Sequence, residues 1–157
     1  MSEAVRQFEE AFARWLGVRS AFAFWKGRVA LYVILRALGI GEGDEVILPG
    51  YTCVVAVNPI KMLGAKPVYV DIEPVTYNIA PEQIEAKITP RTRLILAQHT
   101  YGYPAEMDAI LDIARRRSRG DRRRAGLRLD GWRPRQTEGL HVQVCRQIEV
   151  RRRQGQV

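Results

Sequence analysis

Residues 43–53, GDEVILPGYTC, decide the fold, because they join a turn to a short apolar strand and then to the start of a helix. Gly41, Gly43 and Asp44 predict the turn. Glu45 to Leu48 read as the strand, which Pro49 ends because proline offers no N–H to a strand ladder.

Upstream of this stretch the sequence predicts two helices. Apolar residues recur at helical spacing from Val5 to Leu16, and Gly17 suits the end of that helix. Residues 21–24 (AFAF) predict a short extended piece. Residues 28–38 are nearly all apolar, so we expect a helix that is buried on most sides and ends at Gly39.

Downstream, strands and helices alternate. We expect Thr52 to cap a helix that runs to Leu63, with Pro59 causing a kink or a late start. Further elements follow in order: a strand over 67–70, a helix over 81–87, a turn over 89–92, a buried strand over 94–98 and a helix over 106–116. This alternation predicts an α/β fold with a mostly parallel sheet flanked by helices.

The charge changes sharply near residue 115. Residues 1–114 hold 11 Lys and Arg against 13 Asp and Glu, whereas residues 115–157 hold 14 Arg, no Lys and 4 Asp and Glu. The net charge of +8 therefore comes from the last part of the chain, which shows no sustained helical or strand period. We predict a partial folded domain over 1–116 and an irregular, Arg-rich tail over 117–157, frameshifted or disordered.

Several classes of protein are not indicated. No apolar run is long enough to span a membrane, and the first residues do not read as a signal peptide. Cys53 and Cys145 have neither metal-ligand nor disulfide spacing, so we expect reduced thiols and a cytoplasmic location. Asp44, Asp71 and Glu73 follow or precede separate strands, so we interpret them as solvated turn residues and expect no metal.

Six segments in order carry a family resemblance: KGRVAL (26–31), GDEVI (43–47), GAKPVYVDI (64–72), ITPRT (88–92), HTYG (99–102) and MDAI (107–110). Over residues 5–116 the chain resembles the DegT/DnrJ/EryC1/StrS family of pyridoxal-phosphate (PLP) aminotransferases. The resemblance implies the N-terminal part of the large domain of the type I aminotransferase fold. It also implies a homodimer that transfers an amino group from an amino acid to a keto-sugar nucleotide, although some members are dehydratases.

The resemblance also implies cofactor-binding residues. The segment matching Gly27 and Arg28 lies at the cofactor phosphate, where both would offer backbone amides. A glycine before a helix is more often only a turn, so that interpretation stays open. Members often have Ser where Lys26 stands. Thr52 would hold the same loop, and Cys53 stands where an aromatic ring commonly stacks on the pyridine; a cysteine would pack but not stack.

Two residues are candidates for substrate contacts. His99 and Tyr101 follow a predicted strand at its carboxyl end, which is where open α/β sheets bind ligands. Packing and loop hydrogen bonds are an equally open interpretation of both side chains.

The catalytic groups of the family are absent. PLP chemistry needs a lysine that forms a Schiff base and an acid that holds the pyridinium proton. The family carries the acid in a V-I-E-D-A-type strand after the helix that ends near Arg116, and the lysine later. The lysines here are Lys26, Lys61, Lys66 and Lys87, all earlier in the chain. We therefore expect no catalytic residue, an inactive chain and no covalent PLP.

A frameshift would explain the Arg-rich tail. Residues 120–124, GDRRR, can be encoded as GGT GAT CGA AGA CGC, which reads V-I-E-D-A one nucleotide later. That is the missing motif at the place where the family carries it. We hypothesise a frameshift near Arg117, after which the sequence is accidental.

Two other functions stay open from the sequence. The chain could be a non-catalytic fragment, with PLP at most bound non-covalently at Gly27. Alternatively, the basic tail could bind nucleic acid nonspecifically through Arg–phosphate contacts. The tail has one aromatic residue, Trp132, and no recognised nucleic-acid-binding module.

Overall fold

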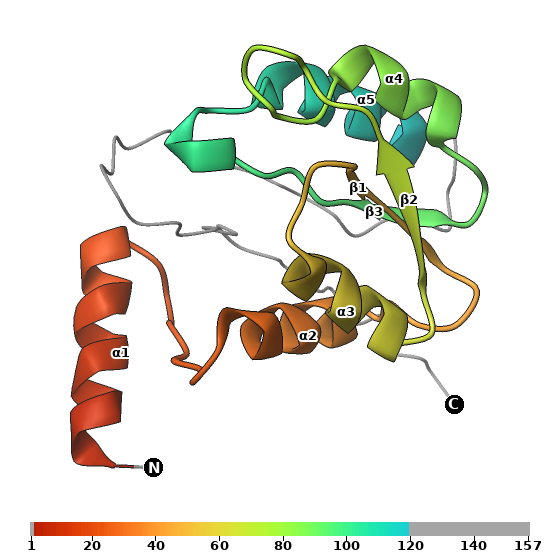
Figure 1. Ribbon diagram of the computed structural model, residues 1–157. Helices are drawn as coiled ribbons and strands as arrows, with labels where there is room; N and C mark the ends of the chain where they lie inside the picture. Colours follow the sequence, from red (N-terminus) through yellow and green to blue (C-terminus); the bar gives the residue numbers. More distant parts are fainter. Residues whose placement is uncertain (1, 120–157) are drawn as a thin grey trace.

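The computed structural model describes residues 2–119. The predicted irregular tail was 117–157. Residues 117–119 belong instead to helix α5 (Met107–Arg119), and the tail from residue 120 onward lies outside the described residues. Figure 1 shows a small sheet with helices on both faces, and helix α1 standing apart from them. This is the predicted α/β arrangement. Within residues 2–119, no helix is long and apolar enough to cross a membrane.

Strand β1 is the centre of the sheet. Its bounds are Glu45–Pro49, and it lies between β2 (Lys66–Val70) and β3 (Thr92–Ile95) in the order β2-β1-β3. Both pairings are parallel, with Ile47 opposite Val68 on one side and Ile95 on the other. The prediction of a parallel sheet is therefore confirmed for the described part of the chain.

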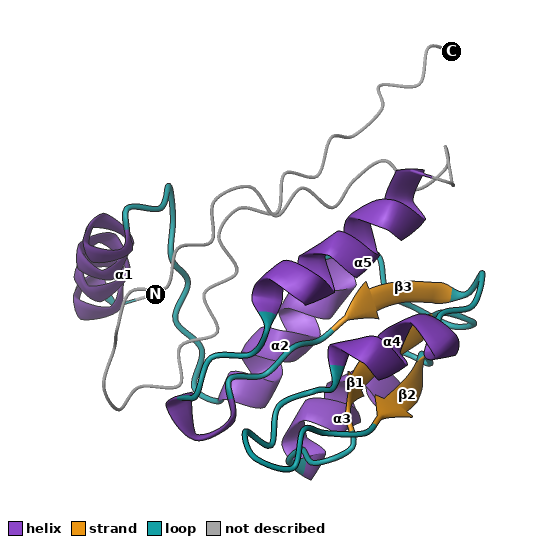
Figure 2. Ribbon diagram, turned by 90° about the horizontal axis from the view of Figure 1, so that it is seen from above, coloured by secondary structure: helices purple, strands orange, loops and turns teal. Residues whose placement is uncertain are grey.

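Alternate residues of β1 build two separate cores. Val46 and Leu48 pack with Leu35 and Ile60, which belong to helices α2 (Gly27–Ala37) and α3 (Val54–Met62). Ile47 points to the opposite face. There it joins Ile84, Ile110 and Ile113, from α4 (Pro81–Lys87) and α5 (Met107–Arg119). Figure 1 shows the two helix pairs on opposite sides of the strands, and Figure 2 shows the same elements from above.

Several predicted elements are confirmed. Helix α1 spans Glu3–Leu16 and ends at Gly17, whose φ of 68° is the left-handed conformation that glycine adopts at low cost. Helix α2 is followed by Gly39 at φ 75°, and α4 spans the predicted residues 81–87. The turn at 89–92 closes through a hydrogen bond from the Thr92 amide to the Thr89 carbonyl at 3.1 Å.

Other predictions were wrong in part. Within α2 only Leu35 is buried, and Val33 is 41% exposed, because α3 and the sheet cover a single face of the helix. A buried strand was predicted over 94–98, but strand β3 ends at Ile95. Residues 94–98 are only half-buried, because β1 is the one partner of β3 in the described sheet. Residues 21–24 belong to no strand.

A buried carboxylate joins the three strands at their amino ends. Glu45, at the start of β1, is 2% exposed and accepts hydrogen bonds from the Thr89 hydroxyl at 2.5 Å and from the Arg91 guanidinium at 3.1 and 3.3 Å. Lys66, at the start of β2, lies 3.7 Å from the same carboxylate. Burial of a charge is costly unless it is paired and hydrogen-bonded, and Glu45 meets both conditions.

These contacts determine the protonation of Glu45. The hydrogen bond from Thr89 lowers its pKa below the usual 4.5, with Arg91 and Lys66 acting in the same direction and burial acting against them. A carboxyl whose pKa is lowered by folding stabilises the fold above its unfolded pKa. That stabilisation is lost as the pH falls through the folded pKa.

We predict that Glu45→Gln lowers the free energy of unfolding at pH 7 by about 1–3 kcal/mol, because Gln leaves Arg91 and Lys66 without a counter-charge and cannot accept the same set of bonds. Urea denaturation measures the change. The difference from wild type should shrink as the pH falls below about 4.5. Glu10→Gln on the exposed side of α1 is the matched control; equal losses in the two variants would contradict the role of Glu45.

Candidate functional site

The carboxyl edge of the sheet gathers all the segments that the sequence singled out. Strand β1 leads into the loop before α3, and β3 leads into residues 99–102. Helix α2 precedes β1, so its C-terminus meets the amino edge and its N-terminus returns to the carboxyl edge. Figure 1 shows α2 and α3 side by side with their N-terminal ends at the same side. Ligands of open α/β sheets bind at this edge.

The N-terminus of α2 can bind an anion. Gly27 is the first helical residue and Lys26 the N-cap, and no side chain caps the helix. The first amides that bond back are those of Val29 and Ala30, which donate to the Lys26 carbonyl at 3.0 and 3.2 Å. Within the described residues, the amides of Gly27 and Arg28 are thus directed out of the helix, where its dipole favours negative charge.

The start of α3 differs from the prediction. The N-cap is Cys53 and not Thr52, and no side chain makes a capping bond. The helix begins at Val54 and contains Pro59 in its interior, so the late start that Pro59 suggested was wrong. The Thr52 hydroxyl is buried and has no hydrogen-bond partner in the described part of the chain, while the Cys53 thiol is free and exposed. An orphaned buried hydroxyl is costly, so Thr52 is suited to a ligand that supplies the missing bond.

The loops after β1 and β3 meet through two phenols. The hydroxyl of Tyr51 lies 2.7 Å from that of Tyr101, and this hydrogen bond raises the pKa of Tyr51. Tyr77, from the loop after β2, adds a third ring 5.5 Å from the Tyr51 ring. The structure therefore brings the Thr52–Cys53 loop beside the His99–Tyr101 loop, while Gly27 and Arg28 belong to the N-terminus of α2.

The buried side chain of Asn78 joins the loop after β2 to the loop after β3. It is 2% exposed. Its side-chain oxygen accepts a bond from the Thr100 amide at 2.8 Å, and its side-chain nitrogen donates to the Tyr103 carbonyl at 3.0 Å. The Thr100 hydroxyl donates to the Tyr77 carbonyl at 3.1 Å. The loop after β2 is therefore fixed against the loop after β3.

His99 lies at the carboxyl edge of the sheet, and its ring also makes a hydrogen bond within its own loop. Its Nδ1 accepts a hydrogen bond from the Ala105 amide at 3.0 Å, which places the ring proton of the neutral form on Nε2. Burial lowers the pKa of His99 below 6.5. The loop-bonding interpretation is thus supported for Nδ1, and a substrate contact of this residue stays a prediction.

Three residues at this edge were not predicted from the sequence. Two of them are Tyr51 and Tyr77. The third is Gln98, directly before His99, whose side-chain oxygen is buried and has no partner among the described residues. Their position immediately after strands was the available signal. What the sequence did not contain was the side-by-side arrangement of three loops.

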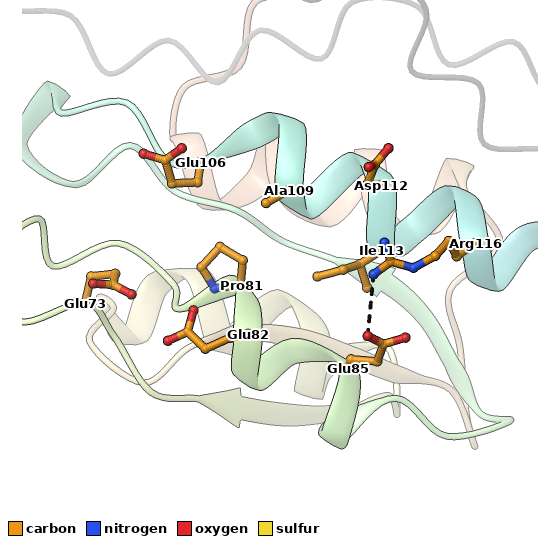
Figure 3. Close-up of a pocket in the computed structure, with 9 residues that line it drawn as sticks. All are labelled: Glu73, Pro81, Glu82, Glu85, Glu106, Ala109, Asp112, Ile113 and Arg116. Atoms are coloured by element: carbon orange, nitrogen blue, oxygen red, sulfur yellow. Dashed lines mark hydrogen bonds and ion pairs between the residues drawn. The ribbon is translucent and has the colours of Figure 1, made fainter.

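A groove of about 520 Å³ lies elsewhere, between α4 and α5. Figure 3 shows its lining of five carboxylates from Glu73, Glu82, Glu85, Glu106 and Asp112, with Arg116 bonded to Glu85 at 3.4 Å. None of the predicted site residues lines it. A lining of this charge repels a phosphate, so the groove is a poor site for an anionic ligand.

Metal-ligand geometry is missing among residues 2–119, where no three His, Cys, Asp or Glu residues are grouped to hold an ion. Asp44 accepts a bond from the Gly41 amide at 3.0 Å and pairs with Arg93 at 3.7 Å. Asp71 accepts a bond from the Ile72 amide at 2.8 Å. These are contacts of ordinary turn residues.

Comparison with known proteins identifies the family. The profile of the DegT/DnrJ/EryC1/StrS aminotransferase family matches residues 1–118. The chain belongs to this family. The predicted resemblance is therefore confirmed, over slightly more residues than the sequence motifs covered.

Individual relatives agree. The chain is 47% identical over 110 residues to GDP-perosamine synthase of Caulobacter vibrioides, covering 70% of this chain and 30% of that protein. It is 46% identical over 110 residues to UDP-2-acetamido-2-deoxy-3-oxo-D-glucuronate aminotransferase of Pseudomonas aeruginosa, covering 70% and 31%. The chain thus spans about a third of the length of the curated relatives it matches.

Solved structures share the fold. DesV of S. venezuelae, solved in complex with a ketimine intermediate, superposes with a TM-score of 0.71 at 38% identity, covering 75% of this chain and 32% of that one. NtdA of Bacillus subtilis, with its cofactor PMP bound, gives 0.72 at 38% identity, covering 75% and 27%. The described part is a PLP aminotransferase fold, and the nucleic-acid-binding alternative is not favoured.

We predict that protonation of His99 destabilises the fold. Its pKa is lower in the folded state, so its contribution to stability is complete above about pH 6.5 and is lost as the pH falls through the folded pKa. In His99→Asn the amide oxygen can still accept the Ala105 bond but does not titrate. The free energy of unfolding of wild type should therefore fall more steeply than that of the variant between pH 7 and 5. Parallel pH profiles would show that His99 does not titrate in this range.

Proposed function

We propose that this chain is the N-terminal part of a PLP-dependent aminotransferase that moves an amino group from an amino acid to a keto-sugar nucleotide. The observation that carries the proposal is that the Thr52–Cys53 loop lies beside the His99–Tyr101 loop at the carboxyl edge of the sheet. The N-terminus of α2 lies on the same side of the molecule (Figure 1). The names of the sugar-nucleotide relatives support the substrate class.

The phosphate end of the cofactor fits α2. The amides of Gly27 and Arg28 would donate to phosphate oxygens, and the helix dipole would add to the attraction. Lys26 adds a positive charge next to them, where the family often has Ser. Its ammonium lies 5.9 Å from the centre of the exposed Trp25 ring.

The ring end of the cofactor fits the loop after β1. The buried Thr52 hydroxyl would gain the partner it lacks, and Cys53, exposed and free, would pack beside the ring without stacking on it. When bound, PLP supplies the electron sink that stabilises a carbanion at the amino-bearing carbon. His99 and Tyr101 would contact the substrate.

The described part exposes large apolar side chains in the segment before α2. Phe22 and Trp25 are 76% and 77% exposed, and both precede α2. Large apolar side chains gathered on a surface mark a contact with further protein. This supports a contact of this surface with further protein. We propose that a frameshift near Arg117 has replaced the continuation of a longer parent protein. We propose that the chain as it stands is inactive, because neither the Schiff-base lysine nor the acid is present.

We predict that Gly27→Pro weakens the binding of PLP to the 157-residue chain about tenfold, because proline removes one amide that bonds to the phosphate. Proline is well tolerated as the first helical residue, and the extended Lys26 (φ −146°, ψ 138°) is compatible with a following proline. Isothermal titration with PLP and with inorganic phosphate measures the loss.

Gly27→Ala is the matched control. A Cβ at residue 27 would meet no atom within 4 Å, and alanine keeps the amide. It should bind PLP like wild type, and both variants should keep the wild-type melting temperature. Unchanged PLP affinity in the proline variant would argue against phosphate binding at α2.

We predict that borohydride fixes no PLP to a defined lysine. Lys26 is the lysine at the carboxyl edge, whereas Lys61, Lys66 and Lys87 lie toward the amino edge in the described part of the chain. Mass spectrometry after reduction measures the adduct, with Lys26→Arg as the control that keeps the charge. Stoichiometric labelling of Lys26 alone would contradict inactivity. Restoring V-I-E-D-A by one nucleotide in the gene should yield a longer product that is labelled on a later lysine.

A further inference from the structure

Three tyrosines form an exposed aromatic cluster on the carboxyl edge. Tyr51, Tyr77 and Tyr101 are 47%, 45% and 75% exposed. The Tyr51 ring lies 5.5 Å from that of Tyr77 and 6.5 Å from that of Tyr101, at interplanar angles of 44° and 56°. The cluster draws one ring from the loop after each of the three strands.

Two of these residues hold an unfavourable backbone conformation. Tyr77 and Tyr101 have φ values of 57° and 53°, and they are the non-glycine residues with positive φ in the described part of the chain. The left-handed conformation costs a residue with a Cβ of the order of 1–2 kcal/mol. Such strain persists only where the surroundings impose it, and it concentrates at functional sites.

The surroundings that impose the strain are visible. The buried Asn78 and the Thr100 hydroxyl tie both loops together through bonds at 2.8, 3.0 and 3.1 Å. The Tyr77 amide also donates to the Glu73 carbonyl at 2.9 Å. These contacts belong to the backbone, to Asn78 and to the Thr100 hydroxyl, so they do not need tyrosine rings. The fold therefore holds two rings in a strained conformation without burying them in a core.

We propose that this cluster binds the nucleoside of the nucleotide-sugar substrate, with the base stacked on the Tyr101 ring. The inference rests on the function proposed above and adds a subsite to it. Every base has an aromatic face, so stacking on tyrosine accepts purine and pyrimidine alike. That tolerance suits a family whose relatives are named for both GDP-linked and UDP-linked compounds. The paired phenols of Tyr51 and Tyr101 add donors and acceptors for ribose hydroxyls.

The position of the cluster gives the substrate its direction. Tyr51 is adjacent in the chain to Thr52 and Cys53, which line the ring end of the cofactor in the proposed function. A nucleotide sugar whose base lies on Tyr101 can therefore extend across Tyr51 toward that loop. The site keeps the base at the exposed rim, where Tyr101 has the largest exposed fraction of the three.

The test uses UDP as the probe and the complete 157-residue chain. Tyr101→Asn is the informative variant, because asparagine accepts the left-handed conformation and the variant loses an exposed ring together with its exposed hydrogen bond to Tyr51. We expect it to weaken UDP binding about tenfold by isothermal titration. It should leave pyrophosphate binding unchanged and keep or raise the melting temperature. Tyr101→Phe should stay within about twofold of wild type, because the ring that stacks remains.

Tyr69→Val is the matched control, since Tyr69 is a tyrosine of strand β2 that is 48% exposed and outside the cluster. It should bind UDP like wild type. Saturation-transfer NMR should show the uracil protons closest to the protein. UDP affinity no greater than that of pyrophosphate in wild type, or equal UDP affinities in wild type and Tyr101→Asn, would overturn the subsite. The PLP titration of Gly27→Pro tests the proposed cofactor site separately from this subsite.

Discussion

Strand β1 is hydrogen-bonded along both edges and packed on both faces, and the positions of the other described elements follow from it. Its five residues are buried throughout. Because the side chains of a strand alternate, Val46 and Leu48 bind α2 and α3 to one face while Ile47 binds α4 and α5 to the other. Glu45 then joins the starts of all three strands through Thr89, Arg91 and Lys66.

The amino and carboxyl ends of the strands differ in how their buried polar groups are satisfied. At the amino ends, a buried carboxylate is satisfied by hydrogen bonds and opposite charges, so that end stabilises the fold. At the carboxyl ends, the Thr52 hydroxyl and the side-chain oxygen of Gln98 are buried without partners among the described residues. The backbones of Tyr77 and Tyr101 are strained there as well. Unsatisfied and strained groups concentrate where ligands bind, which is why this edge is the better candidate site than the acidic groove between α4 and α5.

Much of this architecture was predictable because it depends on local rules. Gly17 and Gly39 end helices through their left-handed conformations, and Pro81 begins α4 at the residue where a proline costs no hydrogen bond. The predictions were wrong where burial or capping depends on contacts with residues that are distant in the sequence. The burial of α2 and β3 depends on what covers them. The N-cap of α3 is Cys53 and not Thr52, and no side chain makes a capping bond there. Tyr51 and Tyr77 were missed because tyrosines in loops have no pattern of their own.

The sequence by itself determined the family, the order of strands and helices, the absence of a Schiff-base lysine at the place where the family carries it, and the abrupt change to an Arg-rich composition near residue 115. Periodicity, turn residues and motif order are properties of neighbouring residues, so they can be read along one chain. The tertiary structure decided which loops meet. Tyr51, Tyr77 and Tyr101 are separated by more than twenty residues in each case, and only the parallel order β2-β1-β3 brings their loops to one edge. The strain in Tyr77 and Tyr101 likewise comes from Asn78 and Thr100, contacts that exist only after that sheet has formed.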